Sequence, residues 1–475
     1  HAGDRVRSGA RASARRAAFD LRRRYPHLSA ARRDPRMGAL FAGPAIFACG
    51  AIVAAPETTF ALLWAAAALG LLTVAGLRAA AALTRPVYSA RKPLSRARLP
   101  SVSVLCPVHD EPFEVLAALA ASLSRMDYPR DRLEAVFVVE ETDPATLAAA
   151  IKAAAPYGFS VVAVRDIGPR TKPKALNAAL ARTNGALVAV YDAEDAPAPD
   201  QLRAAAEAFA ADARLGCVQA PLGWYNADET WITGQFALEY AAQFHVMLPF
   251  YRRLGWPPPL GGTSNVFRRD ALAACGGWDP FNVTEDADIG FRLARFGWRI
   301  GLIEPGTLEE APLSVRPWLA QRSRWLKGHL ITTLVHLRDT PGLARAAGRG
   351  APVSLIATLG ANAASAALHG PSLIVCLALA LATGAGATGA GVTGPAAHAG
   401  LAVLFAGYAC AALAAHVGLK RAGLAARPLM LATLPLYWPL QSLALVRALH
   451  ELAAAPYSWA KTRHGLSRIA RDKRS

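Results

Sequence analysis

Long stretches without a charged side chain constrain this sequence more than any other feature. Gly350 to Leu419 holds no Asp, Glu, Lys or Arg in 70 residues. Shorter uncharged stretches run from Met37 to Pro56, from Thr58 to Leu77 and from Pro428 to Val446. A helix of about 20 apolar residues crosses a bilayer. The sequence therefore predicts membrane-spanning helices rather than a very apolar soluble core.

These stretches divide the chain into zones. Residues 37–84 predict two transmembrane helices. Residues 346–450 predict three or four more, and we favour four, at about 351–368, 371–388, 398–418 and 428–446. The other zones are a basic arm at 1–36, expected to be poorly ordered, a basic linker at 85–100, an α/β zone at 101–312, an amphipathic interfacial region at 313–345 and a basic tail at 451–475.

The net charge of +18 gathers at the two ends of the chain. Residues 1–36 carry 11 Arg against 3 Asp, and residues 461–475 carry 6 Lys or Arg against 1 Asp. No base-reading motif accompanies this charge, so we exclude nucleic acid as a partner. Basic flanks beside membrane spans mark the cytoplasmic side and contact the lipid bilayer. We therefore expect a multi-pass protein of the inner or plasma membrane, with residues 101–312 in the cytoplasm.

Residues 101–312 alternate β-branched runs with Ala-rich segments of helical spacing. The runs are 101–106, 135–140, 160–165 and 186–191, and the segments between them are 114–125, 144–155 and 174–183. Such a β-α-β order predicts a mainly parallel sheet covered by helices. Ligands of these sheets bind beyond the carboxyl ends of the strands.

Acidic clusters follow the expected strands at this edge. Glu140-Glu141 closes the second strand, Asp192-Ala193-Glu194-Asp195 follows the fourth, and Thr284-Glu285-Asp286 comes later. Two carboxylates one residue apart suit Mg²⁺ or Mn²⁺, which prefer oxygen ligands and leave positions open for phosphates. Such a cation neutralises a diphosphate leaving group. An acidic turn by itself is more often a solvated loop, so the neighbouring motifs decide its meaning.

Two further segments belong to the same edge. The first strand runs into Pro107, His109, Asp110 and Glu111, polar groups beside a proline turn. The third strand leads to the basic loop 168–177, which opens a helix. Its lysines near a helix N-terminus favour a phosphate, although a plain turn and a solvated charge run explain both segments too.

The order of these motifs resembles family 2 glycosyltransferases of the GT-A fold, in the membrane-embedded branch of cellulose, chitin and hyaluronan synthases. Gln321-Arg322-Ser323-Arg324-Trp325 fits the QxxRW signature of that branch. The resemblance covers nearly the whole chain: paired spans, catalytic domain, interfacial segment and further spans. It implies an α/β GT-A domain inserted between transmembrane helices.

The resemblance also implies roles for individual residues. Asp286, in the triplet with Thr284 and Glu285, becomes the general base that takes the proton of the acceptor hydroxyl. Asp192 and Glu194 become the metal ligands, with Glu in place of the usual second Asp. The implied nucleotide-sugar contacts are Pro107, His109, Asp110, Glu111, Glu140, Glu141, Lys172, Lys174 and Asp192, although the family usually has aspartates where Glu140 and Glu141 stand. The implied acceptor and diphosphate contacts are Gln321, Arg324, Trp325, Gly262, Thr263 and Ser264.

The implied activity is inverting transfer of a sugar from a UDP-sugar, with Mg²⁺ or Mn²⁺, to a growing polysaccharide or glycan. In its sharper form this enzyme is processive and works with an accessory subunit for export. One alternative is transfer of a single sugar to a lipid or short glycan. Alternatives from other classes are a catalytically silent membrane scaffold or transporter and a nucleotide-binding sensor. The sequence does not identify the sugar or the linkage.

Overall fold

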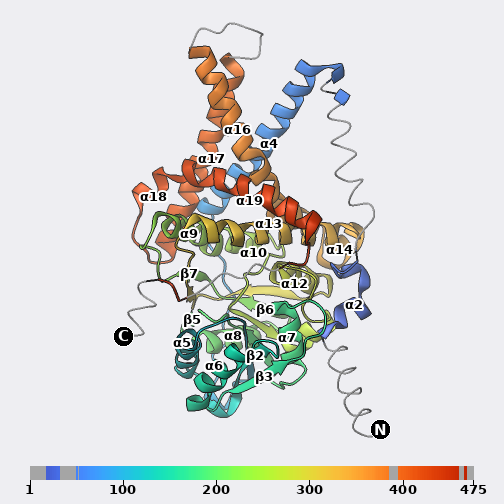
Figure 1. Cartoon of the computed structure of the whole chain (residues 1–475), viewed down its shortest axis with the longest axis vertical. Helices are drawn as coiled ribbons and strands as arrows, with labels where there is room; N and C mark the ends of the chain where they lie inside the picture. The colour runs from blue at the N-terminus through green and yellow to red at the C-terminus, as the bar shows by residue number, and fades with distance from the viewer. Residues whose placement is uncertain (1–17, 33–49, 52, 385–393, 459–464, 468–475) are drawn as a thin grey trace.

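The computed structural model describes residues 18–32, 50–51, 53–384, 394–458 and 465–467. An α/β domain forms the lower part of Figure 1, a layer of helices crosses above it, and long helices rise from that layer. The first expected span, 37–56, lies almost wholly outside the described residues.

The central sheet has the strand order β3-β2-β1-β4-β8-β6-β9. Its strands are β1 (Val102–Val108), β2 (Leu133–Glu140), β3 (Ser160–Val164), β4 (Leu187–Val190), β6 (Leu215–Gln219), β8 (Asn265–Arg268) and β9 (Arg299–Leu302). β1 pairs in parallel with β2 and β4, while β8 runs antiparallel to β4 and β6. The expected run of parallel strands is therefore confirmed as β1 to β4.

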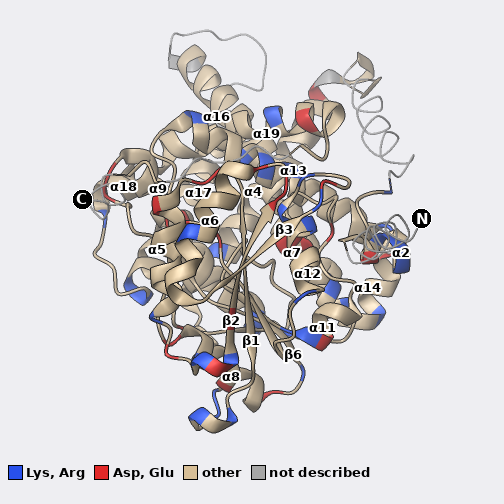
Figure 2. Ribbon diagram, turned by 60° about the horizontal axis from the view of Figure 1, so that its bottom comes forward, with Lys and Arg blue, Asp and Glu red and all other residues tan. Residues whose placement is uncertain are grey.

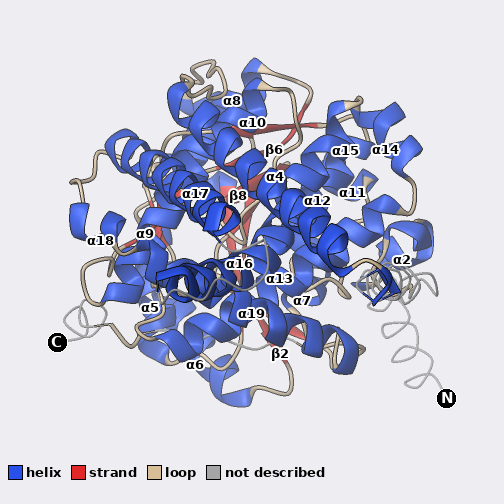
Figure 3. Ribbon diagram, turned by 90° about the horizontal axis from the view of Figure 1, so that it is seen from above, coloured by secondary structure: helices blue, strands red, loops and turns tan. Residues whose placement is uncertain are grey.

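Helices cover both faces of this sheet because its strands alternate their buried side chains. In β1, Val104 and Cys106 pack into one core, whereas Leu105 packs into the other. The first face is covered by α5 (Phe113–Ser124), α6 (Pro144–Ala154) and α8 (Gln201–Ala211). The second is covered by α7 (Lys172–Leu180), α11 (Arg269–Ala274) and α12 (Glu285–Arg295). Seen from above, the strands lie beneath a surround of helices (Figure 3).

The antiparallel strand β8 brings a loop to the edge where the parallel strands end. Val190, the last residue of β4, pairs with Asn265, the first residue of β8. Residues 261–264 therefore lie beside the turn that follows β4. A small sheet, β5 (Ala196–Pro197), β10 (Thr307–Glu309) and β7 (Leu222–Trp224), adds to the same region. The turn after β4, the loop before β8 and the strands β7 and β10 are distant in sequence, and they meet at this edge of the central sheet.

A layer of helices crosses over this edge. It contains α9 (Trp231–Ala242), the π turn η5 (Gln243–Met247), α10 (Leu248–Arg253), α13 (Val315–Leu337), α14 (Thr340–Ala347), α18 (Pro428–Ala432) and α19 (Leu434–Ala454). The region 313–345, expected at the membrane surface, forms α13 and α14. Trp318, Lys327 and His336 of α13 are fully buried, because α13 packs between α12 and α19. Short 3₁₀ turns, η2 (Arg96–Arg98), η3 (Arg130–Arg132) and η4 (Ala155–Tyr157), complete the domain.

The expected span 428–446 is divided between α18 and α19 and is not among the helices of the described residues that are long and apolar enough to cross a membrane. The chain breaks between α18 and α19, and α19 lies across the molecule beneath the rising helices (Figure 1). Contacts with the helical layer hold it there. Lys327 Nζ of α13 lies 3.2 Å from Glu451 Oε2, and the Tyr437 hydroxyl donates to Glu239 of α9 at 2.6 Å.

Within the described residues, three helices are long and apolar enough to cross a membrane. They are 57–83 in α4 (Pro56–Leu83), 350–382 in the continuous run α15 (Gly350–Leu355), η6 (Ile356–Gly360) and α16 (Ala361–Gly384), and 398–421 in α17 (Gly394–Arg421). They indicate a membrane protein.

One of these helices replaces two of the expected spans, 351–368 and 371–388. Pro371 lies inside the helix, where a proline removes a backbone hydrogen bond. Ser442 of α19 satisfies the backbone nearby: its hydroxyl accepts from the Gly370 N–H at 3.0 Å and donates to the Ala366 carbonyl at 2.5 Å. The helix therefore continues through the proline.

Part of the basic arm is folded, against the expectation of poor order. Residues 18–32 contain α2 (Asp20–Arg24) and the turn η1 (Pro26–Leu28). Leu21 is fully buried, and the Ala30 N–H donates to Asp279 at 2.6 Å. Figure 2 shows this basic helix at the edge of the molecule, beside α14. The arm packs on the α/β domain through the buried side chains of Ala18, Leu21 and Leu28.

Candidate active site

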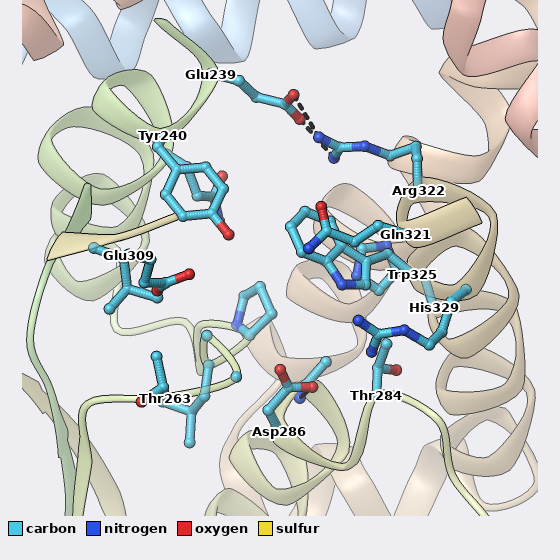
Figure 4. Close-up of a pocket in the computed structure, with 18 of the residues that line it drawn as sticks. Glu239, Tyr240, Thr263, Thr284, Asp286, Glu309, Gln321, Arg322, Trp325 and His329 are labelled. Carbon is cyan, nitrogen blue, oxygen red and sulfur yellow. Dashed lines mark hydrogen bonds and ion pairs between the residues drawn. The ribbon is translucent and has the colours of Figure 1, made fainter. Parts of the chain in front are cut away.

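A cavity of about 350 Å³ opens at the carboxyl ends of β1 and β4 and continues between the helices. Strand-end residues form its lower wall, and α9 and α13 form its upper wall. Its far end is lined by residues of α4, α16, α17 and α19. Figure 4 shows Asp286 at the floor, below Gln321 and Trp325. The ligand-binding edge of the sheet is thus joined to the apolar helices by one cavity.

The turn after β4 is fixed from two sides. The Asp192 N–H donates to Asp195 Oδ2 at 2.8 Å, and Asp195 also accepts a short hydrogen bond from the Thr263 hydroxyl. Lys172 forms an ion pair with Asp192 and donates to the Gly262 carbonyl at 2.7 Å. Asp195 therefore links the turn after β4 to the loop before β8, and residues of both segments line the cavity.

Carboxylates crowd this part of the cavity. Burial raises the pKa of Glu194, and the charges of Asp192 and Glu111 raise it further. Burial and the neighbouring carboxylates likewise raise the pKa of Asp195 and Glu309. One carboxylate oxygen of Glu309 is buried without a hydrogen-bond partner. This arrangement favours a cation, because like charges in a poorly hydrated site repel.

The donor set fits a divalent cation that shares its coordination with phosphate. The described residues contain no group of three or more His, Cys, Asp or Glu side chains arranged to enclose a metal. Asp192 and Glu194 do line the cavity together. Mg²⁺ is commonly bound through one or two carboxylates plus substrate phosphates rather than by a protein cage. These residues therefore fit the metal that the family implies.

Helix α13 contacts the segment just before Asp286, at the start of α12. The Thr284 N–H donates to Asn282 Oδ1 at 3.1 Å, and Asn282 in turn donates to the Thr332 hydroxyl of α13 at 2.8 Å. Thr284 also contacts α13 at Gly328, where any β-carbon would collide with it. The QxxRW helix and the Thr-Glu-Asp triplet are therefore one packed unit.

Asp286 stands in the first turn of α12 and faces the cavity (Figure 4). Gly262 passes so close that a β-carbon there would lie 3.3 Å from Asp286 Oδ2. Burial raises the pKa of Asp286, although the Ala287 N–H and the cations of Lys172 and Arg324 oppose the shift. Burial and the charge of Asp286 raise the pKa of Glu285 to about 7. A carboxylate with a raised pKa is a stronger base.

The residues of the QxxRW motif have different surroundings. Gln321, Arg324 and Trp325 line the cavity, and Arg324 faces the carboxylates of Glu285 and Asp286. Burial lowers the pKa of Arg324 despite these carboxylates. Such a guanidinium beside the floor suits a diphosphate through its planar fork of donors.

The intervening Arg322 forms a structural junction. Its guanidinium donates to both oxygens of Glu239, at 2.8 and 2.7 Å, as the dashed lines of Figure 4 show. It also lies 4.6 Å from the ring centre of Trp325 and 5.3 Å from that of Trp318. Glu239 also accepts from the Tyr437 hydroxyl. This cluster ties α9, α13 and α19 together above the cavity.

Some predicted nucleotide contacts line the cavity. They are Pro107, His109, Glu111, Glu140, Lys172 and Asp192. His109 Nδ1 lies 3.1 Å from Asp143 Oδ2, and Glu140 pairs with Lys174 at 2.8 Å. Gly262 and Thr263 line the cavity as well, close to the predicted base.

Other predicted site residues lie outside the cavity lining. They are Asp110, Glu141, Lys174 and Ser264. Glu141 is exposed and accepts the Asp166 N–H at 2.9 Å. Lys174 is fully buried against Glu140, and Ser264 is fully buried in the domain. Glu140 is the last residue of β2 and lines the cavity, whereas Glu141 lies in the turn that follows the strand.

Sequence reasoning missed several lining residues. Glu309, at the end of β10, faces the carboxylates of the β4 turn. Glu239 and Tyr240 come from α9, and Arg78 comes from α4. The acidic pair Glu309-Glu310 after a short strand was a usable signal. Arg78, a charge within an apolar stretch, was a usable signal as well, whereas no local pattern marks Glu239 and Tyr240.

Comparisons with known proteins identify the family of the α/β domain. Residues 100–328 match the family model described as glycosyltransferase like family 2. A beta-monoglucosyldiacylglycerol synthase of Trichormus variabilis is 31% identical over 267 residues, 55% of either chain. Cellulose synthase 2 of Novacetimonas hansenii is 26% identical over 278 residues, 56% of this chain and 17% of that one. The chain thus spans about half the length of the first of these relatives.

A solved structure has the same fold. The mannosyltransferase PcManGT from Pyrobaculum calidifontis, in complex with GDP-Man and Mn²⁺, superposes with a TM-score of 0.55 at 24% identity, covering 82% of this chain and 97% of that chain. The sheet and the superposition together define an α/β domain of the GT-A fold. Residues 100–328 are a glycosyltransferase family 2 domain, and the resemblance read from the motif order is confirmed.

Proposed function

We propose that the chain transfers one sugar, with inversion, from a nucleotide sugar to a hydroxyl group of a membrane lipid. The continuity of the cavity carries this proposal: Asp286 lies at one end, and Ala411 and Ala414 of the apolar helix α17 lie at the other. An acceptor with a hydroxyl group at one end and hydrocarbon at the other fits this cavity, because the hydroxyl group can lie at Asp286 and the hydrocarbon beside α17. The match to a beta-monoglucosyldiacylglycerol synthase supports a lipid acceptor.

In the proposed reaction Asp286 accepts the proton of the acceptor hydroxyl while its oxygen attacks the anomeric carbon. A new glycosidic bond forms on one face of the sugar, and the bond to the diphosphate breaks on the other. The nucleoside diphosphate leaves with the electron pair. Arg324 and Lys172 lie where their charges stabilise that leaving group. Gly262 leaves room for the acceptor beside Asp286.

Asp192 and Glu194 would hold Mg²⁺ or Mn²⁺, which would supply positive charge beside the diphosphate. The Mn²⁺ in the PcManGT structure supports this assignment. UDP is the proposed nucleotide, on the resemblance of the motifs. The GDP-Man of PcManGT makes guanine nucleotides the natural comparison.

We place the catalytic domain in the cytoplasm. The basic residues 18–32 pack on this domain, and the basic linker 85–100 leads directly into it. Positive flanks favour the cytoplasmic side.

Processive synthesis of a polymer is the second candidate function. The QxxRW motif and the match to a cellulose synthase favour it, and an accessory export subunit would then be expected. A polymer needs a path across the membrane. Only three candidate spans occur in the described part of the chain, and α19 lies across the layer rather than beside them. We therefore prefer single transfer.

The test is transfer by purified protein in nanodiscs that contain candidate lipids. A panel of UDP- and GDP-sugars is offered with Mn²⁺, Mg²⁺ or EDTA, and released nucleotide and product length are read. We expect metal-dependent nucleotide release and a lipid with one added sugar. Asp286→Asn should abolish both, whereas Asp270→Asn, an exposed residue of α11, should not. A ladder of products would favour the polymer. Absence of nucleotide binding by folded protein would overturn the assignment.

A further inference from the structure

Arg78 is a cation inside an apolar helix and lines the far end of the cavity. It lies five residues before Leu83, the last residue of α4. Its guanidinium stands 4.5 Å from the ring centre of Trp438. Within the described residues, no hydrogen bond or ion pair joins Arg78 to another side chain. An ionisable residue in a membrane helix is expensive and usually marks a ligand or ion path.

The charges around Arg78 leave it uncompensated. The carboxylate of Glu239 lines the same region, but Arg322 binds both of its oxygens and Tyr437 donates to one of them. On α16, the imidazole of His369 is bonded to the Tyr408 hydroxyl at 2.7 Å and supplies no negative charge. This end of the cavity is therefore positive, whereas the floor holds the carboxylates.

The helices around Arg78 line the cavity with both apolar and polar side chains. Leu359 of η6, Ala414 and Ala415 of α17 and Leu434 of α19 are apolar, whereas Asn362 and Ser365 of α16 and Gln441 of α19 are polar and uncharged. A ligand that fills the cavity thus passes from a carboxylate floor, past a guanidinium, to walls without negative charge. Arg78 stands near the end of its span, about one and a half helical turns from Leu83. For α4, a helix of 28 residues and about 42 Å centred on a hydrocarbon core about 30 Å thick, this position falls near the boundary between acyl chains and lipid phosphates.

We propose that Arg78 binds the phosphate of an anionic glycerophospholipid acceptor, whose head-group hydroxyl reaches Asp286. The proposal rests on the proposed function and specifies its acceptor. An arginine fork suits phosphate, and Trp438 holds the guanidinium by a cation–π contact. A neutral diacylglycerol lacks the anion. A polyprenyl phosphate has the anion but no hydroxyl beyond it, so its phosphate would need to lie at the floor among carboxylates.

The experiment compares Arg78→Gln, Arg78→Lys and the wild type in nanodiscs with phosphatidylglycerol, diacylglycerol or polyprenyl phosphate. Arg447→Gln, an exposed arginine of α19 paired with Glu451, is the control. Arg78→Gln should raise KM for phosphatidylglycerol about 10-fold or more, because a hydrogen bond to a charged group is lost. Arg78→Lys should lose less, and Arg447→Gln should match the wild type. Donor hydrolysis without lipid should stay unchanged in all of them.

Native mass spectrometry of bound phosphatidylglycerol gives a second readout that does not need turnover. Weaker binding by Arg78→Gln, with wild-type binding by Arg447→Gln, supports the proposal. Equal losses for phosphatidylglycerol and diacylglycerol would assign Arg78 to packing against Trp438 and overturn it. Preference for polyprenyl phosphate would overturn it as well. If nucleotide release is absent, the proposed function itself fails, whereas release without phospholipid binding sinks only the acceptor assignment.

Discussion

Gly328 of α13 touches Thr284 so closely that a β-carbon at position 328 would fall 2.3 Å from the Thr284 hydroxyl oxygen. The contact joins the QxxRW helix to the triplet that carries Asp286. Asn282 adds to it by donating to Thr332, one turn further along α13. The position of the predicted base is therefore set by a helix that starts 29 residues after it in the chain (Asp286 to Val315).

Gly328→Ala should impair catalysis more than stability. The added methyl group must displace Thr284 and with it Asp286, and a misplacement near 1 Å lowers rates about 100-fold. We expect a large fall in kcat with donor KM little changed, measured by nucleotide release. Gly407→Ala is the matched control, because no atom lies within 4 Å of a β-carbon there. Equal kcat in both variants would show that the contact does not position Asp286.

The reaction rate should fall in acid at a higher pH than an ordinary aspartate would give. Asp286 works as a base only when ionised, and burial raises its pKa. Burial and the charge of Asp286 raise the pKa of its neighbour Glu285 to about 7. A pH profile of kcat/KM should therefore show activity rising with pH above the range in which an ordinary aspartate ionises. In Glu285→Gln, which removes a negative neighbour, the rise should move to lower pH. If the pH profile of Glu285→Gln matches that of the wild type, Glu285 does not affect the ionisation of Asp286.

Breaking the ion pair between Glu239 and Arg322 should destabilise the helical layer. Glu239→Leu leaves a buried guanidinium unpaired, which costs about 3–5 kcal/mol. We expect a clear drop in the thermal midpoint in detergent. Arg322→Met added to Glu239→Leu should recover part of it, because an apolar pair replaces an unpaired charge.

The matched control is Arg214→Ala, which removes an exposed ion pair with Asp212. Exposed pairs add little stability, so its midpoint should stay close to that of the wild type. Additive losses in the Glu239 and Arg322 variants would show that the two side chains do not stabilise each other.

Loss of Asp279 should release the N-terminal arm. Asp279 accepts from the Ala30 N–H at 2.6 Å and from the Ser29 hydroxyl at 3.1 Å. In Asp279→Ala these donors lose their partner, so trypsin should cleave faster at Arg22 to Arg24. Asp270→Ala, on the exposed side of α11, should leave cleavage unchanged. Equal cleavage of both variants would mean that other contacts, such as buried Leu21, hold the arm alone.

Local sequence patterns predicted the core of the domain well. β-branched runs predicted β1 to β4 within a few residues, because a buried parallel strand needs apolar side chains on both faces. The turn with Asp192 and Glu194 lies at the expected edge for the same reason. Such patterns could not tell which of two neighbouring acidic residues lines the cavity. Glu140, at the end of β2, lines the cavity, whereas Glu141, in the turn that follows, does not.

The sequence by itself determined the α/β domain, its family and the presence of membrane-crossing helices, because strand patterns, motifs and uncharged runs are properties of short segments. Only the tertiary structure decided how those segments combine. Ser442 of α19 lets one helix pass through Pro371, and buried ion pairs hold α19 across the layer. Arg78 packs against Trp438, 360 residues later in the chain, and Glu309 faces the carboxylates of Asp192 to Asp195, more than 100 residues before it. Contacts of that range leave no periodic signal in the chain, so the fold alone brings them together.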